Sequence, residues 1–314
     1  NTIQSILFTY IKIQLTMTDI NFDNFKVRCS AISMVLSNSR SNPVLTEKQT
    51  GRLAQLEATA ELKPLTDKMQ AELSELYVKK ANGSKVILSD TCISYLMTEY
   101  AWRTERMVSV TKELMDIPQL QKGVLVEADS LMLLSKVDGV LYQPNINEND
   151  ERERVYNDYL SGEVDAYGGD GIIGATILPD IKSIWDYPTF LCKIHEPLTI
   201  ANDWQLKGYG DISGCTDLFV ANCLINTPEN IIESLKFKLL KKLDVATEES
   251  PIFRHKWDII ERSLRFDHIP EHKRVFKKKV EPMSEIQKQQ LYDRVKVCRE
   301  WLNQFHETYQ NLNK

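Results

Sequence analysis

Residues 216–225, TDLFVANCLI, restrict the possible folds of this chain most strongly, because they are apolar almost without a break. A strand that is covered on both faces of a sheet has this pattern, whereas a strand with one solvated face alternates. Segments of strand character and of helix character precede and follow this stretch, which indicates a sheet with helices packed on it. We therefore expect an α/β or α+β domain whose mixed central sheet is flanked by helices.

Residues 161–190, SGEVDAYGGDGIIGATILPDIKSIWDYPTF, place acidic side chains around a glycine-rich turn. Side chains two residues apart share one face of a strand, so Asp180 and Lys182 project together while Ile181 points to the other face. Asp165 precedes the turn and can meet them across the hairpin. Two carboxylates can hold a hard divalent cation, and an ammonium beside them can orient a water or offset charge on a phosphate. The pattern indicates phosphodiester hydrolysis, although such residues also occur on solvated strand faces.

Residues 119–137 predict one helix that carries a glutamate within an apolar stripe. The stripe consists of Leu120, Val124, Glu127, Leu131 and Leu134. A carboxylate among apolar neighbours needs a partner, because burying it unpaired is costly. A metal ion is one such partner, and an arginine or lysine from elsewhere in the chain is the other.

Four elements in this order resemble the PD-(D/E)XK nuclease superfamily. They are the helical Glu127, Gly162-x-x-Asp165, Asp180-Ile181-Lys182-Ser183 and Gln205-x-x-x-Tyr209. The last element is typical of the branch that holds lambda exonuclease, the YqaJ-type viral recombinases and the RecB nuclease domain. The resemblance covers about residues 25–36 and 88–300, and it implies a restriction-endonuclease-like core.

The resemblance implies a magnesium-dependent nuclease, with Mn²⁺ as an alternative cofactor, that degrades one strand of duplex DNA from an end in phage-type recombination or DNA processing. The implied metal ligands are Glu127, Asp165, Asp180 and the carbonyl of Ile181. The implied catalytic residues are Asp165, Asp180, Lys182, Gln205 and Tyr209. Lys182 would position or activate the attacking water, while Gln205 and Tyr209 would hold the DNA backbone. Further implied partners are a single-strand annealing protein and other copies of the chain.

Two positions depart from the family pattern. Val164 stands where the family has proline, and Pro179 stands where it has a β-branched residue. Because proline cannot donate to a strand ladder, we expect the strand to begin at Asp180 or to be bulged there. Two other functions stay open, namely a structure-specific or nicking endonuclease, and a non-catalytic DNA-binding or assembly protein whose site Pro179 has spoiled.

The net charge of -5 conceals two poles of opposite sign. Residues 145–180 hold nine acids and two arginines, whereas residues 251–280 hold nine lysines and arginines against four acids. A metal site needs clustered carboxylates and a polyanion needs a basic track, so both poles suit a metal-dependent nuclease. We expect the acidic connector at 145–154 to be solvated. The predicted DNA-binding residues of the basic strand are Lys273, Arg274, Lys277, Lys278 and Lys279. The resemblance to lambda-type and YqaJ-type enzymes also implies that Ser30 lies near a DNA phosphate, and a helix N-cap is the other interpretation of this residue.

Residues 44–80 repeat a leucine pattern and predict two helices in an antiparallel hairpin. We expect this hairpin as an insertion in a single nuclease domain at 17–314, which ends in a basic strand and a helix at about 251–314. Residues 1–16 lack the basic start and cleavage site of a signal peptide, and we interpret them as a non-native leader. The six cysteines have no zinc-like spacing and no apolar run is long enough to span a membrane, so we expect a cytoplasmic protein, in the host cytoplasm if the chain is viral.

Overall fold

The computed structural model describes residues 20–37, 45, 47–82, 87–110, 117–147, 149 and 151–312. Its contacts divide the chain into two compact units, one drawn from 1–25, 34–107 and 290–314 and the other from 26–33 and 108–289. The predicted leader at 1–16 lies outside the described residues. Because two such units can belong to one domain, the single domain at 17–314 stays a prediction. Within the described part, no helix has the length and apolar character of a membrane span.

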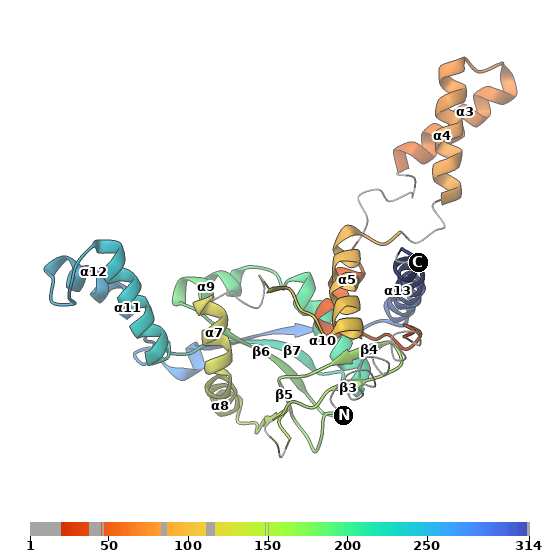
Figure 1. The fold of residues 1–314 in the computed structure, drawn as a ribbon. Helices are drawn as coiled ribbons and strands as arrows, with labels where there is room; N and C mark the ends of the chain where they lie inside the picture. Colours follow the sequence, from red (N-terminus) through yellow and green to blue (C-terminus); the bar gives the residue numbers. More distant parts are fainter. Residues whose placement is uncertain are drawn as a thin grey trace, which may run out of the picture. The chain divides into compact units, whose positions relative to one another are not determined.

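The second unit is built on a three-stranded sheet (Figure 1). Its strands are β6 (Leu178–Ile184), β7 (Leu218–Leu224) and β8 (Val275–Val280). β7 lies in the middle, parallel to β6 and antiparallel to β8. Every residue of β7 is buried, as expected for a strand covered on both faces. The structure therefore confirms the mixed sheet and the central apolar strand.

Three helices cover this sheet: α8 (Glu127–Asp138) on one face, and α9 (Tyr187–His195) and α10 (Ile200–Ser213) on the other. On the first face, Ile181 of β6 and Phe219 of β7 share an apolar cluster with Leu134 of α8. Asp180 and Lys182 project from the opposite face, because side chains alternate along a strand. The two catalytic candidates of β6 thus lie on the side of α9 and α10.

Pro179 lies inside β6, so the expectation that the strand begins or bulges at Asp180 was wrong. It pairs in register with Phe219. Leu178 donates its N–H to the carbonyl of Asp217, on the β7 side, at 2.9 Å, so the nitrogen of Pro179 points to the opposite edge. β6 is the outer strand of this sheet. A proline is tolerated there because its missing N–H faces no strand of the same sheet.

The helix predicted at 119–137 is divided into α7 (Pro118–Leu125) and α8. Val126 separates the two helices with φ -108° and ψ 17°. Its side chain is buried in the apolar cluster that also contains Leu134 and Ile181. The predicted stripe is broken at this residue, and Leu120 is 63% exposed. Glu127 is consequently the first residue of α8, and it lies at the end of a helix instead of within a continuous apolar face.

Two smaller sheets lie before β6 in the sequence. They contain β1 (Val27–Arg28), β4 (Leu160–Gly162) and β3 (Val155–Tyr156) in one, and β2 (Gln143–Pro144) and β5 (Ala166–Tyr167) in the other. After β5 the chain reverses through Gly169 and Gly174, whose φ values of 112° and 79° favour glycine. A bridge between Gly168 and Ile177 closes this reversal. The turn brings Asp165, which precedes β5, beside β6.

Further helices complete the two units. The second unit also contains η1 (Cys29–Ala31), α11 (Glu229–Leu243), α12 (Pro251–Arg262) and η2 (Glu271–Lys273), and the remaining helices are α2 (Ile32–Val35), α3 (Glu47–Leu62), α4 (Asp67–Asn82), α5 (Asp90–Glu105) and α13 (Glu285–Asn311). α3 and α4 confirm the two helices of the predicted hairpin, because Leu53, Leu56, Leu73 and Leu76 are buried in one cluster. Arg52 and Glu72 add an ion pair at 2.8 Å across it.

Candidate active site

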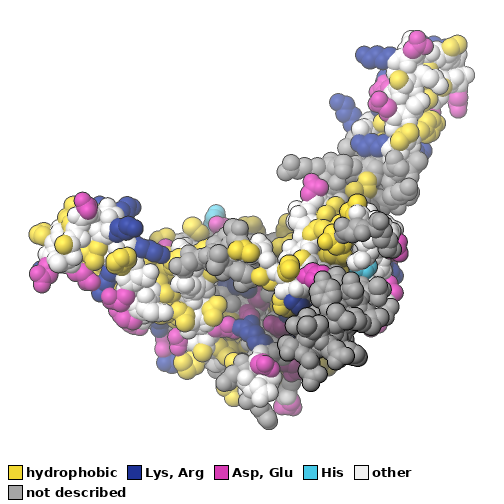
Figure 2. Space-filling model, in the orientation of Figure 1, with side chains coloured by type: hydrophobic (Ala, Val, Ile, Leu, Met, Phe, Trp, Pro, Cys, Tyr) yellow, Lys and Arg dark blue, Asp and Glu magenta, His cyan; other side chains and the backbone are white. Residues whose placement is uncertain are grey.

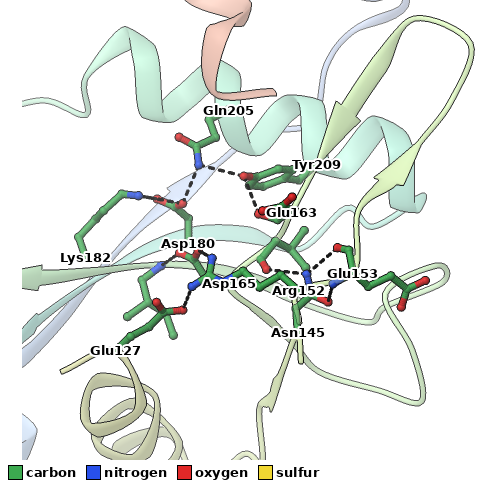
Figure 3. Close-up of polar contacts among 12 residues, drawn as sticks. Glu127, Asn145, Arg152, Glu153, Glu163, Asp165, Asp180, Lys182, Gln205 and Tyr209 are labelled. Atoms are coloured by element: carbon green, nitrogen blue, oxygen red, sulfur yellow. Dashed lines mark hydrogen bonds and ion pairs between the residues drawn. The ribbon is translucent and has the colours of Figure 1, made fainter. Parts of the chain in front are cut away.

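The second unit gathers acidic, basic and amide side chains at β6 (Figure 3). Asp180 is only 1% exposed, and the ammonium of Lys182 donates a hydrogen bond to its Oδ1 at 3.0 Å. The same Nζ lies 2.8 Å from Oδ2, close enough for an ion pair but without hydrogen-bond geometry. Both side chains project from one face of the strand, so the structure brings these two predicted residues together.

Asp165 reaches the same place from the residue before β5. Its Oδ2 accepts the backbone N–H of Ile181 at 3.0 Å. This N–H points to the outer edge of β6, so the carboxylate supplies the acceptor that a neighbouring strand would otherwise provide. The carbonyl of Ile181 points to the same edge, because the N–H and C=O of one strand residue share a side. The carboxylate of Asp165 also lies close enough to Asp180 to raise the pKa of that group.

Glu127 approaches from α8, where the first helical residue lies at the positive end of the helix dipole. Arg152 bridges it to Asp165, because the guanidinium contacts Oε1 of Glu127 and lies 3.2 Å from Oδ1 of Asp165. The expectation that the connector at 145–154 is merely solvated was therefore wrong for Arg152. The sequence did contain a signal, since Arg152 is one of two arginines among nine acids.

Further contacts hold this connector beside the site. The amide of Asn145 donates to the carbonyl of Glu153 at 2.8 Å and to the carbonyl of Val164 at 3.0 Å. Arg154, two residues after Arg152, pairs with Glu163 at 2.5 Å. The connector is thus fixed at both ends by polar contacts, and Arg152 projects from a positioned segment.

The pKa values of the site carboxylates are shifted, because these groups are close together and partly removed from water. Burial raises the pKa of Asp180 to about 6, an effect that Lys182 opposes and Asp165 reinforces. Burial also raises the pKa of Glu127, against the influence of Arg152. Burial lowers the pKa of Lys182, but the carboxylates of Asp180 and Asp165 outweigh it and leave the pKa raised. Lys182 is therefore a cation at neutral pH.

Gln205 and Tyr209 lie four residues apart on α10 and face the site together. The amide of Gln205 donates to Oδ1 of Asp180 at 3.2 Å and to the hydroxyl of Tyr209 at 3.1 Å. That hydroxyl donates to the carbonyl of Glu163 at 2.9 Å. A Cβ at Gly162 would lie 2.5 Å from Cε1 of Tyr209, so the glycine permits this close approach. The chain of hydrogen bonds orients Asp180 from the side of α10.

The residues predicted to bind DNA lie on several elements. Ser30 is exposed within η1, and the N-cap position belongs to Arg28. Lys273 ends η2 and Arg274 follows it, so the basic strand begins only at Val275. Lysine and arginine side chains also gather over α11 and α12 in Figure 2, but acidic side chains lie on the same helices. That surface has mixed charge.

The lysines of β8 project from opposite faces of the sheet. Lys277 and Lys279 share the face that α8 covers, where the ammonium of Lys277 pairs with Asp138 at 2.8 Å. Lys278 projects from the other face, which it shares with Lys182. The strand register therefore separates neighbouring basic residues that looked equivalent in the sequence.

The donor set suits a hard divalent cation, although the acids do not surround one point. Among the residues that the structure describes, no three His, Cys, Asp or Glu side chains form a metal-binding group. The guanidinium of Arg152 lies between Glu127 and Asp165 instead, so this pair of acids already shares one positive charge. Carboxylate and carbonyl oxygens are the ligands that Mg²⁺ and Mn²⁺ prefer. Such a cation would have to replace the guanidinium to contact both Glu127 and Asp165.

Comparisons with known proteins rest on the fold. No family model and no curated protein sequence matches the chain. Among solved structures, a phage-related exonuclease from Haemophilus somnus 129PT is similar with a TM-score of 0.52 and 16% sequence identity, over 93% of this chain and 97% of that one. This chain has the fold of that exonuclease. The comparison confirms the mixed α/β fold that the resemblance to PD-(D/E)XK nucleases implied.

The alkaline exonuclease LHK-Exo from Laribacter hongkongensis is also similar, at 10% identity and a TM-score of 0.49, over 93% of this chain and 94% of that one. The same enzyme in complex with dAMP gives a TM-score of 0.48.

Proposed function

We propose that this chain is a magnesium-dependent deoxyribonuclease that degrades one strand of duplex DNA from an end, with Mn²⁺ able to replace Mg²⁺. The observation that carries this proposal is the meeting of Glu127, Asp165, Asp180, Lys182 and Gln205 at one edge of the sheet. The fold shared with a phage-related exonuclease supports the same activity. Pro179 leaves β6 intact, which weakens the alternative of a spoiled, non-catalytic site.

The acids and Lys182 would have different roles in the reaction. Glu127, Asp165, Asp180 and the carbonyl of Ile181 would hold the metal. When bound, the ion would activate a water and offset the charge that develops on the phosphate. Lys182, whose ammonium pairs with Asp180, would position or activate the attacking water and offset charge on the phosphate.

Gln205 and Tyr209 act on the acid through hydrogen bonds. The amide of Gln205 fixes one oxygen of Asp180, and the hydroxyl of Tyr209 fixes the amide. These residues therefore position Asp180, and their contact with the DNA backbone stays a prediction. A single-strand annealing protein and self-association likewise stay predictions.

The test is a cleavage assay of the purified protein with Mg²⁺ on linear, circular and nicked duplex DNA. We expect loss of the linear substrate from its ends, with circular DNA intact and no cleavage in EDTA. Asp180→Ala and Lys182→Ala should each abolish this activity in a folded protein. Cleavage of circular or nicked DNA would instead favour the endonuclease alternative. Binding of duplex without any cleavage would favour a DNA-binding or assembly protein.

A further inference from the structure

A small hollow of about 220 Å³ lies next to Lys182, on the face of the sheet away from α8. Its walls come from all three strands of the sheet and from the segment that joins α9 to α10. The polar side chains that line it include Lys182, Lys193, Asn202, Asn222 and Lys278. Pockets for small organic ligands usually measure about 300–1,000 Å³, so this hollow suits a smaller group.

Asn222 is one of the polar residues in the wall of this hollow. It lies on β7, opposite Lys182 in the parallel pairing, and is 5% exposed. Its side-chain amide makes no hydrogen bond to any residue that the structure describes. The amide therefore keeps its donors and acceptor for a bound molecule or for water. The position of Asn222 in the wall therefore points to a ligand with hydrogen-bond acceptors.

The charges around the hollow favour an anion. Lys193 pairs with the carboxylate of Glu196 at 2.7 Å, and Lys278 donates to the backbone carbonyl of Glu196. Glu196 is the opposing acid at this rim, and Asp180 is the acid paired with Lys182. An ammonium has three donors, so each of the lysines keeps donors for a further acceptor.

The first turn of α10 adds to this positive potential. Thr199, the N-cap residue, also lines the hollow, and its hydroxyl accepts the N–H of Asn202 at 3.2 Å. The free N–H groups of a first turn and the helix dipole both attract anions. The hollow thus combines lysines, a helix N-terminus and an amide that has no hydrogen bond to the described residues.

We infer that this hollow binds a phosphate group of the nucleic acid, next to the phosphodiester that Lys182 would help to cleave. The inference rests on the proposed function for the identity of the substrate. A phosphate has the acceptor oxygens that the amide of Asn222 and the ammonium of Lys278 require, and it is small enough for the space. Of the three lysines of β8, we therefore expect Lys278 to contact this phosphate, because Lys277 and Lys279 project from the opposite face of the sheet.

The experiment measures binding without cleavage. Fluorescence anisotropy of an internally labelled DNA duplex in EDTA gives the dissociation constant over a series of salt concentrations. One phosphate contact contributes about 0.9 to the slope of log K against log salt, so Lys278→Ala should lower that slope by about 0.9 and weaken binding several-fold. Asn222→Asp keeps the shape of the side chain but adds a negative charge, and it should weaken binding at least as much.

Two lysines on the other face provide matched controls. Lys136→Ala removes a charge that pairs with Glu271 on the α8 side, and it should leave the slope unchanged. Lys277→Ala should change the slope less than Lys278→Ala. Equal effects of the Lys277 and Lys278 variants, or normal binding by folded Asn222→Asp, would overturn the inference. Circular dichroism and melting curves establish that each variant is folded.

The source of the phosphate is tested with duplexes that carry either a 5′-phosphate or a 5′-hydroxyl. If Lys278→Ala weakens both equally, the hollow holds an internal phosphodiester. If the effect disappears with the 5′-hydroxyl, it holds a terminal phosphate, and both results support a phosphate site. A wild-type protein that binds DNA through Lys278 but never cleaves it would refute the proposed function alone. Cleavage without any effect of Lys278→Ala or Asn222→Asp on binding would refute this inference alone.

Discussion

Arg152→Ala should tighten the binding of Mg²⁺, because the guanidinium occupies the place between Glu127 and Asp165 that the ion would take. The side chains of Arg152, Glu127 and Asp165 are 35%, 33% and 16% exposed, so solvent weakens both contacts. Each contact between partly exposed charges contributes about 0.5–1 kcal/mol, and the bridge therefore contributes about 1–2 kcal/mol. Since about 1.4 kcal/mol corresponds to a tenfold change, the affinity should rise about 5- to 30-fold.

Isothermal titration of the metal-free protein with Mg²⁺ measures this affinity directly, independently of catalysis. Arg154→Ala is the matched control, because Arg154 lies on the same connector and pairs with Glu163 instead of the two site acids. A melting curve in EDTA supplies a second measurement, since loss of the bridge leaves two nearby carboxylates unscreened and should lower the melting temperature. If Arg152→Ala binds Mg²⁺ no more tightly than Arg154→Ala, the guanidinium does not compete with the metal and the reasoning fails.

Three further predictions follow from burial and close packing in the site. Burial raises the pKa of Asp180 from 3.8 to about 6, so the folded metal-free protein binds more protons than the unfolded chain in that window and loses stability as pH rises through it. Asp180→Asn should abolish that loss and be more stable at neutral pH by on the order of 2 kcal/mol in urea melts, and a less stable variant would contradict the assignment. Tyr209→Phe removes the hydroxyl that donates to the carbonyl of Glu163, so the free energy of unfolding should fall by about 1–2 kcal/mol. Turnover should fall as well, while the affinity for Mg²⁺ stays the same. Normal kinetics would refute the positioning role of Tyr209. Gly162→Ala should lower the free energy of unfolding by about 1–3 kcal/mol and should also lower turnover, because the new Cβ would lie 2.5 Å from the ring of Tyr209. An unchanged melting temperature would show that the ring can move away.

Features with a short sequence period could be predicted without the structure. The unbroken apolar run at 216–225 is β7, because a strand with two covered faces needs apolar residues at every position. The repeated leucines of the hairpin are buried together in α3 and α4. Asp180 and Lys182 lie side by side because a strand repeats every two residues. Gln205 and Tyr209 share a helix face for the analogous reason, the spacing of four residues.

Other features depend on which segments pair, and no local period carries that information. The register of β8 against β7 decides that Lys278, and neither Lys277 nor Lys279, shares a face with Lys182. The position of β6 at the outer edge decides that Pro179 does not interrupt the strand.

The partners of the site acids likewise could not be predicted from the sequence. The sequence by itself placed Asp180 and Lys182 on one face of a strand, because side chains alternate along a strand. Only the tertiary structure decided that Arg152 bridges Glu127 and Asp165, and that the amide of Asn222 has no hydrogen bond to the described residues, because these outcomes depend on contacts between segments far apart in the chain. A charged residue in a connector has the same local pattern whether it is solvated or paired. Its role is therefore set by the folded neighbours that surround it.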